Sequence, residues 1–188
     1  MFQLHAAPLS RIAAVLSVTL LSACSIWPEM PTFGILPSSE APPETAIAQV
    51  NPTQGNEVTG QVKFTRHEND TLVEVSLTHL SPVPHGFHVH EKGDCSAPDG
   101  LSAGGHFNPD GLPHGGLDGP HHIGDLGNVV AGNDGTVNLN VHVKGLRLSG
   151  DQGIIGRAVI VHASADDLKT QPTGGSGKRV ACGMIVHS

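Results

Sequence analysis

Two histidines separated by one residue lie in the stretch GFHVHEKGDC, which covers residues 86 to 95. In a β-strand, successive side chains point to opposite faces, so His88 and His90 would share one face while Val89 points to the other. Two imidazoles on one face can hold one metal ion. A strand with a solvated face can also carry two histidines without a metal, so the pair alone leaves both interpretations open.

More potential ligands lie in the glycine-rich stretch GGHFNPDGLPHGGLDGPHHIGDLGN. They are His106, His114, His121, His122 and Asp125. This stretch has too few apolar residues to fold around its own core, so a bound ion is expected to order it. Three imidazoles and a carboxylate match a closed tetrahedral zinc site, whereas four imidazoles in a near-planar array suit Cu(II). With His162 from the later run GRAVIVH, the chain supplies ligands for two metals.

The composition favours metal chemistry and argues against some partners. Thirteen histidines accompany only 10 lysines and arginines, an unusual ratio that favours metal binding over a purely structural role. The formal net charge is -7, so neither nucleic acid nor an acidic membrane surface is an expected partner.

The N-terminus predicts export. Arg11 precedes the apolar run IAAVLSVTLL, which is too short for a membrane-spanning helix of about 20 residues and suits a signal peptide. The run ends in LSAC, which resembles the lipobox of bacterial lipoproteins, where the cysteine is lipidated and becomes the first mature residue. We therefore expect a lipoprotein signal peptide at 1–23 and a lipidated Cys24, with a plain signal peptide and a free Cys24 as the alternative.

A proline-rich tether at 24–44 is expected to lead to a folded domain at 45–188. If Cys24 is lipidated, only Cys95 and Cys182 remain, and they admit one pairing in an oxidising setting.

The elements that must position the ligands are predicted to be strands. Short runs rich in β-formers recur without a convincing helix, at 46–51, 58–66, 71–80, 86–91, 128–132, 135–143, 156–162 and 179–187. They predict an all-β fold, an eight-stranded antiparallel Greek-key barrel or sandwich. Two long connections, 92–127 and 163–178, are expected to be functional loops. The sequence NDG at 133–135 predicts a β-hairpin.

Five motifs, taken together and in order, resemble copper/zinc superoxide dismutases: GFHVHEKGDC, GGHFNP, HHIGDLGN, SGDQGIIGRAVIVHASADD and GKRVACG. The resemblance covers about residues 45 to 188. Together with the export signal, it suggests the bacterial members of this family that are exported as lipoproteins. It implies an oxidoreductase that disproportionates superoxide, the small-molecule substrate, to dioxygen and hydrogen peroxide. It also implies one copper and one zinc per subunit.

The resemblance assigns roles residue by residue. The implied copper ligands are His88, His90, His106 and His162. The implied zinc ligands are the bridging His106 with His114, His122 and Asp125, and the pattern of His, any residue, Gly, Asp selects His122 over His121. The remaining implied roles are a carboxylate linking copper and zinc histidines at Asp166, an anion-positioning guanidinium at Arg179, a Cys95–Cys182 disulfide and a channel-lining Thr173. Because the chain and the substrate are both negative, we also expect Lys169 and Lys178, in the second long loop, to steer the anion toward copper.

Two hypotheses without catalysis remain beside this one. One is an envelope lipoprotein that buffers or delivers copper or zinc, and the other is a catalytically silent domain of the same fold. Loss of His162 or Arg179 would favour the first, and both residues are present. The expected location is the bacterial cell envelope, with the chain attached to a membrane through Cys24. The domain would face the periplasm or the cell exterior. Ser25 after the lipidated cysteine favours the outer membrane. A homodimer is possible, with its interface left open.

Overall fold

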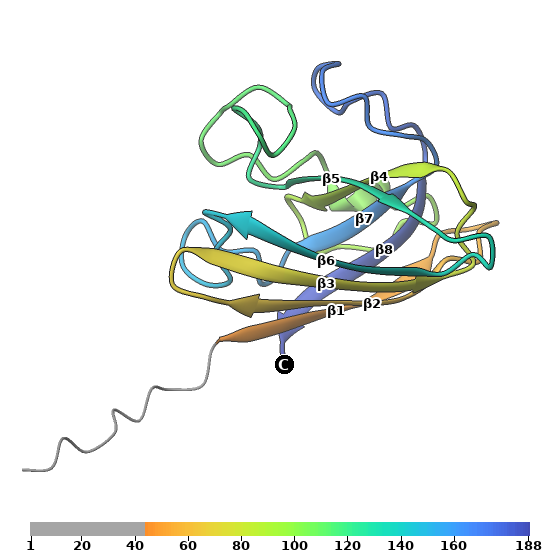
Figure 1. Ribbon diagram of the computed structural model, residues 1–188, viewed down its shortest axis with the longest axis horizontal. Helices are drawn as coiled ribbons and strands as arrows, with labels where there is room; N and C mark the ends of the chain where they lie inside the picture. Colours follow the sequence, from red (N-terminus) through yellow and green to blue (C-terminus); the bar gives the residue numbers. More distant parts are fainter. Residues whose placement is uncertain (1–43) are drawn as a thin grey trace, which may run out of the picture. The chain divides into compact units, whose positions relative to one another are not determined.

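The structure is a computed structural model that describes residues 44–188. The predicted signal peptide, the lipidated Cys24 and nearly all of the tether lie outside the described residues. The strands are β1 (Thr45–Pro52), β2 (Thr59–Arg66), β3 (Asp70–Thr78), β4 (Pro84–His90), β5 (Asp125–Val130), β6 (Val137–Lys144), β7 (Ala158–His162) and β8 (Arg179–His187), as Figure 1 shows.

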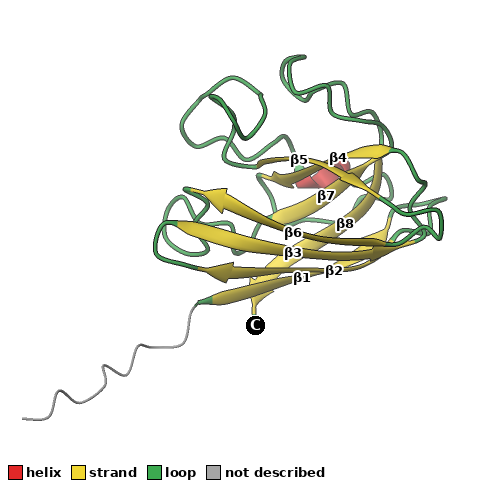
Figure 2. Cartoon of the chain, in the orientation of Figure 1, coloured by secondary structure: helices red, strands yellow, loops and turns green. Residues whose placement is uncertain are grey.

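The strands form one antiparallel sheet in the order β5-β4-β7-β8-β1-β2-β3-β6, which curls into a nearly closed barrel. In Figure 2 the sheet reads as two layers, with β1, β2, β3 and β6 in one and β4, β5 and β7 in the other. The strand order departs from the chain order, as in a Greek key. The predicted all-β, eight-stranded fold is confirmed.

Helical structure within residues 44–188 is limited to one 3₁₀ turn, η1 (Leu101–Ala103), inside the first long loop. No helix among these residues is long and apolar enough to span a bilayer.

Alternation along the strands builds the core. In β3, Val73, Val75 and Leu77 are buried, while the intervening Glu74 and Ser76 face outward. The five residues of β7, AVIVH, are all buried, because β7 lies inside the sheet and is also covered by the loops. The same strand that fills the core therefore ends in a buried histidine, His162.

The prediction of a β-hairpin at NDG is wrong, because the strands before and after this turn, β5 and β6, do not pair with each other. The turn itself forms, since the Gly135 N–H donates to the Gly132 carbonyl at 2.9 Å. However, β5 pairs with β4, and β6 pairs with β3. Turn residues fix only a local reversal of the chain, and here the chain crosses between layers so that Val129 and Val137 reach the shared core.

The two long loops rise on the side of β4, β5 and β7 (Figure 1). The first connects β4 to β5 and the second connects β7 to β8. Potential ligands stand where these loops leave the barrel: His90 ends β4, Asp125 begins β5 and His162 ends β7. The rigid strands thus fix both ends of each loop.

Candidate metal centre

The first candidate group consists of four buried histidines whose ring nitrogens lie within 4.8 Å of one another. Its members are His88, His90, His106 and His162. β4 supplies the first two, with ring centroids 6.3 Å apart and Val89 buried in the core between them. β7 is the neighbour of β4, which brings His162 Nε2 to 3.4 Å from His90 Nε2.

The second candidate group shares one histidine with the first. Its members are His106, His114, His122 and Asp125, again with donor atoms within 4.8 Å. Asp125 is opposite His88 in the pairing of β5 with β4, so the strand register joins the two groups. Asp125 Oδ2 accepts backbone N–H groups from Gly115 at 3.2 Å and His122 at 3.0 Å, which fold the loop around the carboxylate.

Unpartnered nitrogens show that this centre fits metal ions. Within the two groups, four buried ring nitrogens have no hydrogen-bond partner in the described part of the chain: His88 Nδ1, His106 Nε2, His114 Nδ1 and His122 Nδ1. Buried polar atoms are nearly always hydrogen-bonded, so unpartnered nitrogens that lie within 4.8 Å of the other donors of their group have the arrangement of metal ligands. The second group offers three imidazoles and a carboxylate, a zinc-type donor set, and the first offers four imidazoles, which suit copper.

His121 stands apart from both groups. Its Nδ1 donates to the Gly119 carbonyl at 2.7 Å, and its Nε2 is buried without a partner. The structure therefore brings His122, and not its neighbour, into the second group.

In three rings of the first group, the nitrogen opposite the centre is held by the protein. His88 Nε2 donates to Asp166 Oδ2 at 2.8 Å, and His90 Nδ1 donates to the Gly104 carbonyl at 2.9 Å. His162 Nδ1 donates to the Gly177 carbonyl at 3.2 Å. Because one nitrogen is engaged outward, the other is turned toward the centre, which fixes both tautomer and ring orientation.

Asp166 connects the two groups. While Oδ2 accepts from His88, Oδ1 accepts from His114 Nε2 at 2.9 Å. Any side chain at Gly174 would overlap Asp166 Oδ1, so glycine lets the second loop close over the carboxylate.

Sequence reasoning missed the residue that orients Asp166. The side-chain amide of Asn128 donates to the Asp166 carbonyl at 2.9 Å and accepts from the Asp166 N–H at 2.8 Å. Asn128 closes the motif HHIGDLGN, and its place beside a ligand-rich run is the one signal that pointed to it.

Burial keeps His88 and His162 neutral, which is the form that binds metals. Desolvation lowers the pKa of His88 to about 4, although the hydrogen bond that His88 donates to Asp166 acts in the opposite direction and raises it. Desolvation likewise lowers the pKa of His162 to about 3, with a further contribution from His88. Burial by itself raises the pKa of Asp166, but its hydrogen bonds with His88 and the Leu168 N–H outweigh burial and lower that pKa to about 2. Neutral rings therefore face an ionised carboxylate.

A cleft of about 630 Å³ opens onto the first group. Its lining includes His90, His162, Thr173, Lys178 and Arg179. Lys169 is not among the lining residues and lies exposed on the second loop. The structure thus brings two of the three predicted channel and steering residues, Thr173 and Lys178, to one opening beside the histidines.

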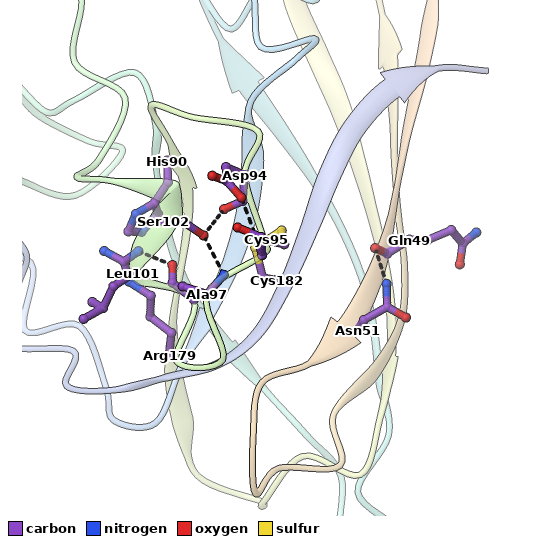
Figure 3. The surroundings of a disulfide bond; sticks show 12 residues. Gln49, Asn51, His90, Asp94, Cys95, Ala97, Leu101, Ser102, Arg179 and Cys182 are labelled. Carbon is purple, nitrogen blue, oxygen red and sulfur yellow. Dashed lines mark hydrogen bonds between the residues drawn. A yellow bond between two sulfur atoms is a disulfide. The ribbon is translucent and has the colours of Figure 1, made fainter.

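Arg179 is fixed at the edge of this cleft by the first loop. Its Nη1 donates to the Gly100 carbonyl at 2.6 Å and its Nη2 donates to the Gly104 carbonyl. Gly104 also accepts from His90, so one carbonyl links the guanidinium to a ring of the first group. Figure 3 shows Arg179 and His90 next to each other beside Leu101.

The predicted disulfide is confirmed. Cys95 and Cys182 are bonded, with their Cα atoms 5.8 Å apart, and they close a loop of 87 residues (Figure 3). The Ser102 hydroxyl donates to the Asp94 carbonyl and accepts from the Ala97 N–H, so the bonded segment is also tied within itself. The chain-entropy model gives about 4 to 5 kcal/mol for a loop of this size. The disulfide attaches the first loop to β8. The Gly100 and Gly104 carbonyls of this loop accept hydrogen bonds from Arg179.

An all-β barrel in which two histidine-rich ligand groups share one imidazole defines a class of proteins with two adjacent metal sites. A family model for copper/zinc superoxide dismutase (SODC) matches residues 58–185. The chain therefore belongs to the copper/zinc superoxide dismutase family. This membership makes it an oxidoreductase whose metals are copper and zinc.

Two relatives illustrate the similarity. An extracellular superoxide dismutase [Cu-Zn] of Brugia pahangi is 42% identical over 155 residues, which cover 77% of this chain and 76% of the relative. A crystal structure of the clock protein EA4 superposes with a TM-score of 0.70 at 40% identity, covering 78% of this chain and 96% of that chain.

Proposed function

We propose that this chain disproportionates superoxide at copper held by the first histidine group, next to zinc held by the second. Two superoxide ions and two protons become one dioxygen and one hydrogen peroxide. The proposed ligands are His88, His90, His106 and His162 for copper, and His106, His114, His122 and Asp125 for zinc.

One observation carries the proposal. His106 belongs to both groups: its Nδ1 lies 2.7 Å from Asp125 Oδ1, while its buried Nε2 has no hydrogen-bond partner. A ring with each nitrogen directed to a different group suits a bridge between two metals. Copper, when bound, supplies one-electron transfer in both directions. His106 Nε2 is also the ring atom that we propose carries a proton to the reduced substrate.

The positive side chains of the second loop are proposed to bring the anion to this site. Arg179 docks superoxide in the cleft, where its guanidinium is already oriented by two carbonyl groups. Thr173 and Lys178 line the same cleft. Lys169 adds positive charge from outside the cleft lining. A local field of this kind raises association rates by roughly 10 to 1000-fold, which offsets the negative net charge of the whole chain.

Metal analysis of the purified mature protein together with a superoxide decay assay tests this function. We expect one copper and one zinc per chain and rapid decay. His162→Ala should lose copper and activity while zinc stays bound, because His162 belongs to the first group alone. A protein that binds both metals and leaves superoxide untouched would instead be a buffering lipoprotein.

We also propose that the domain at 45–188 is carried by a signal peptide at 1–23 and a tether at 24–44, with Cys24 lipidated. The protein would then be attached to a membrane in the bacterial envelope, facing the periplasm or exterior. The relative from Brugia pahangi is named as extracellular, which agrees with an exported enzyme. Cys24→Ser should move the protein from the membrane fraction to the soluble envelope fraction with its activity intact. Retention in the membrane fraction would contradict lipidation.

Pairing of two copies into a homodimer is a further part of the proposal. Met184 and Val186 on β8 are 49% and 40% exposed, and Ile47 stands opposite Val186 on β1, so this face offers apolar area. Sedimentation of the mature protein at micromolar concentration should give twice the mass of the chain. Met184→Lys should shift the mass toward the monomer.

A further inference from the structure

Two histidines and a carboxylate that the buried metal centre does not use lie together on the outer face of the barrel. They are His67 and Asp70, at the two ends of the turn between β2 and β3, and His142 on β6. We propose that these three residues form a second, solvent-accessible site for a divalent transition metal of the Zn(II), Ni(II) or Cu(II) class.

The spacing of one donor pair, His142 with Asp70, matches the spacing of donor pairs in the buried centre of the same protein. His142 Nδ1 donates a hydrogen bond to Asp70 Oδ2 at 3.1 Å, a contact that a bound ion would replace. In the second ligand group, the nitrogen-to-oxygen separations are 3.0 Å for His114 with Asp125 and 3.3 Å for His122 with Asp125. A nitrogen and an oxygen bound to one zinc at about 2.0 to 2.2 Å stand at such separations.

The imidazole separation points the same way. The rings of His67 and His142 have centroids 5.9 Å apart and are tilted by 38°. Within the buried centre, the ring centroids are 5.6 Å apart for His114 with His122 and 6.3 Å apart for His88 with His90. The outer pair therefore has the separation of two imidazoles that share one ion.

The backbone holds the turn in place without a metal. The His67 N–H donates to the Asp70 carbonyl at 2.9 Å, and Arg66 Nη1 donates to the same carbonyl at 2.8 Å. His142 is opposite Leu72 in the pairing of β6 with β3, and Leu72 shares its strand face with Asp70. The strand register therefore brings His142 to Asp70. The His67 ring lies 5.9 Å from the His142 ring, and a rotation of the His67 side chain would turn its nitrogen toward an ion bound between Asp70 and His142.

The carboxylate has spare capacity for a cation. Asp70 Oδ1 is buried and has no hydrogen-bond partner in the described part of the chain, while Oδ2 faces His142. His142 is 59% exposed, so an ion can enter from solvent and complete its coordination with water. Imidazole donors select transition metals over Mg(II) and Ca(II), which take oxygen ligands.

The neighbouring charges set the strength of the site. Lys144 is opposite Asp70 across the strand pair, where its ammonium opposes a bound cation. The guanidinium of Arg66 is engaged with the carbonyls of Asp70 and Glu68. Three protein ligands, high exposure and one opposing lysine make this site weaker than the buried centre, where four donors surround each metal position.

Calorimetric titration of zinc into protein that is already loaded with copper and zinc tests this site. At about pH 7.5, where protons compete weakly with a metal for its ligands, the wild type should bind one further zinc. His142→Ala and His67→Ala should each weaken that binding at least tenfold. Asp70→Asn keeps the side-chain shape and should weaken it similarly. His187→Ala, which removes an exposed histidine from the end of β8, should bind as the wild type does.

Lys144→Gln tests the electrostatic part and should tighten zinc binding several-fold. Metal content and melting temperature of each variant report on the buried centre and the fold, and both should stay at wild-type values. The proposal is overturned if the loaded wild type takes up no further zinc. It is equally overturned if His142→Ala and His187→Ala bind the further zinc alike.

Discussion

The side chain of Gln171 holds the backbone of His114 on both sides. Its Oε1 accepts from the His114 N–H at 2.8 Å, and its Nε2 donates to the His114 carbonyl at 2.9 Å. Gln171 belongs to the loop that carries Lys178 and leads to Arg179, whereas His114 belongs to the proposed zinc group. One amide thus couples the cleft loop to the ligand loop.

Gln171→Ala is expected to weaken zinc binding about tenfold, because removing an outer partner of a ligand typically costs about 10 to 100-fold in metal affinity. Competition with a zinc chelator measures this change. Gln171→Glu retains the acceptor and loses the donor, so it should lie between alanine and wild type. Gln61→Ala, on the outer face of β2, is the control and should leave zinc affinity unchanged. Equal affinities for all three variants would show that the Gln171 contact does not position His114.

Asp166→Asn should reduce the affinity for both metals. The carboxylate accepts from His88 and His114 at once, and an asparagine can accept from only one of them. We expect losses of about 10 to 100-fold for each metal, measured by chelator competition. Asp151→Asn removes an exposed carboxylate elsewhere and should have no effect. Loss of zinc affinity alone would mean that His88 is oriented without Asp166.

Arg179→Glu reverses a charge in the cleft without removing a proposed ligand, so both metals should remain bound. Wild-type turnover should fall as salt rises, because the Debye length shrinks from about 30 Å at 0.01 M to about 8 Å at 0.15 M. The variant should turn over at least about tenfold more slowly at low salt, and its salt dependence should flatten or reverse. Arg179→Lys should lie between, since one ammonium cannot replace the planar fork that reaches both Gly100 and Gly104. Identical salt slopes for wild type and Arg179→Glu would remove Arg179 from the substrate path.

The metal-free protein should lose stability as the pH falls below about 6.5. The pKa values of His88 and His162 are lowered in the fold, to about 4 and about 3, so the unfolded chain binds more protons over this window. These two rings alone should lower the free energy of unfolding by about 3 to 4 kcal/mol between pH 7 and pH 5. His90, whose pKa is also lowered by burial, adds to this loss of stability. The stability contributed by the lowered pKa of Asp166 is lost only below about pH 4, outside this window.

Urea denaturation of the metal-free protein at both pH values measures this difference. His162→Asn removes one of three first-group histidines whose pKa is lowered by burial, the others being His88 and His90, and should reduce the pH dependence by about a third. A metal-free protein equally stable at pH 7 and pH 5 would contradict the burial of neutral imidazoles.

The sequence alone determined the strand content and the identity of the ligand-bearing segments. The period-2 pattern of β3 and the apolar run of β7 follow from side-chain alternation, which is a local property. The same alternation predicted that His88 and His90 lie together, and the ring centroids are 6.3 Å apart. The family motifs gave the order of the remaining histidines and the pairing of Cys95 with Cys182, which the structure confirms.

Only the tertiary structure decided which strands pair and which polar groups orient the ligands. The NDG turn forms as its residues require. However, β5 and β6 do not pair with each other, because β5 pairs with β4 and β6 pairs with β3. Asn128, Gln171 and the Gly104 carbonyl act through hydrogen bonds to residues far away in the chain, and no local pattern encodes such contacts. The same holds for His67 and His142, which are 75 positions apart in the numbering and meet only because β3 pairs with β6. Hydrogen-bond partners across the barrel depend on register and topology, which the chain acquires only when the whole core has folded.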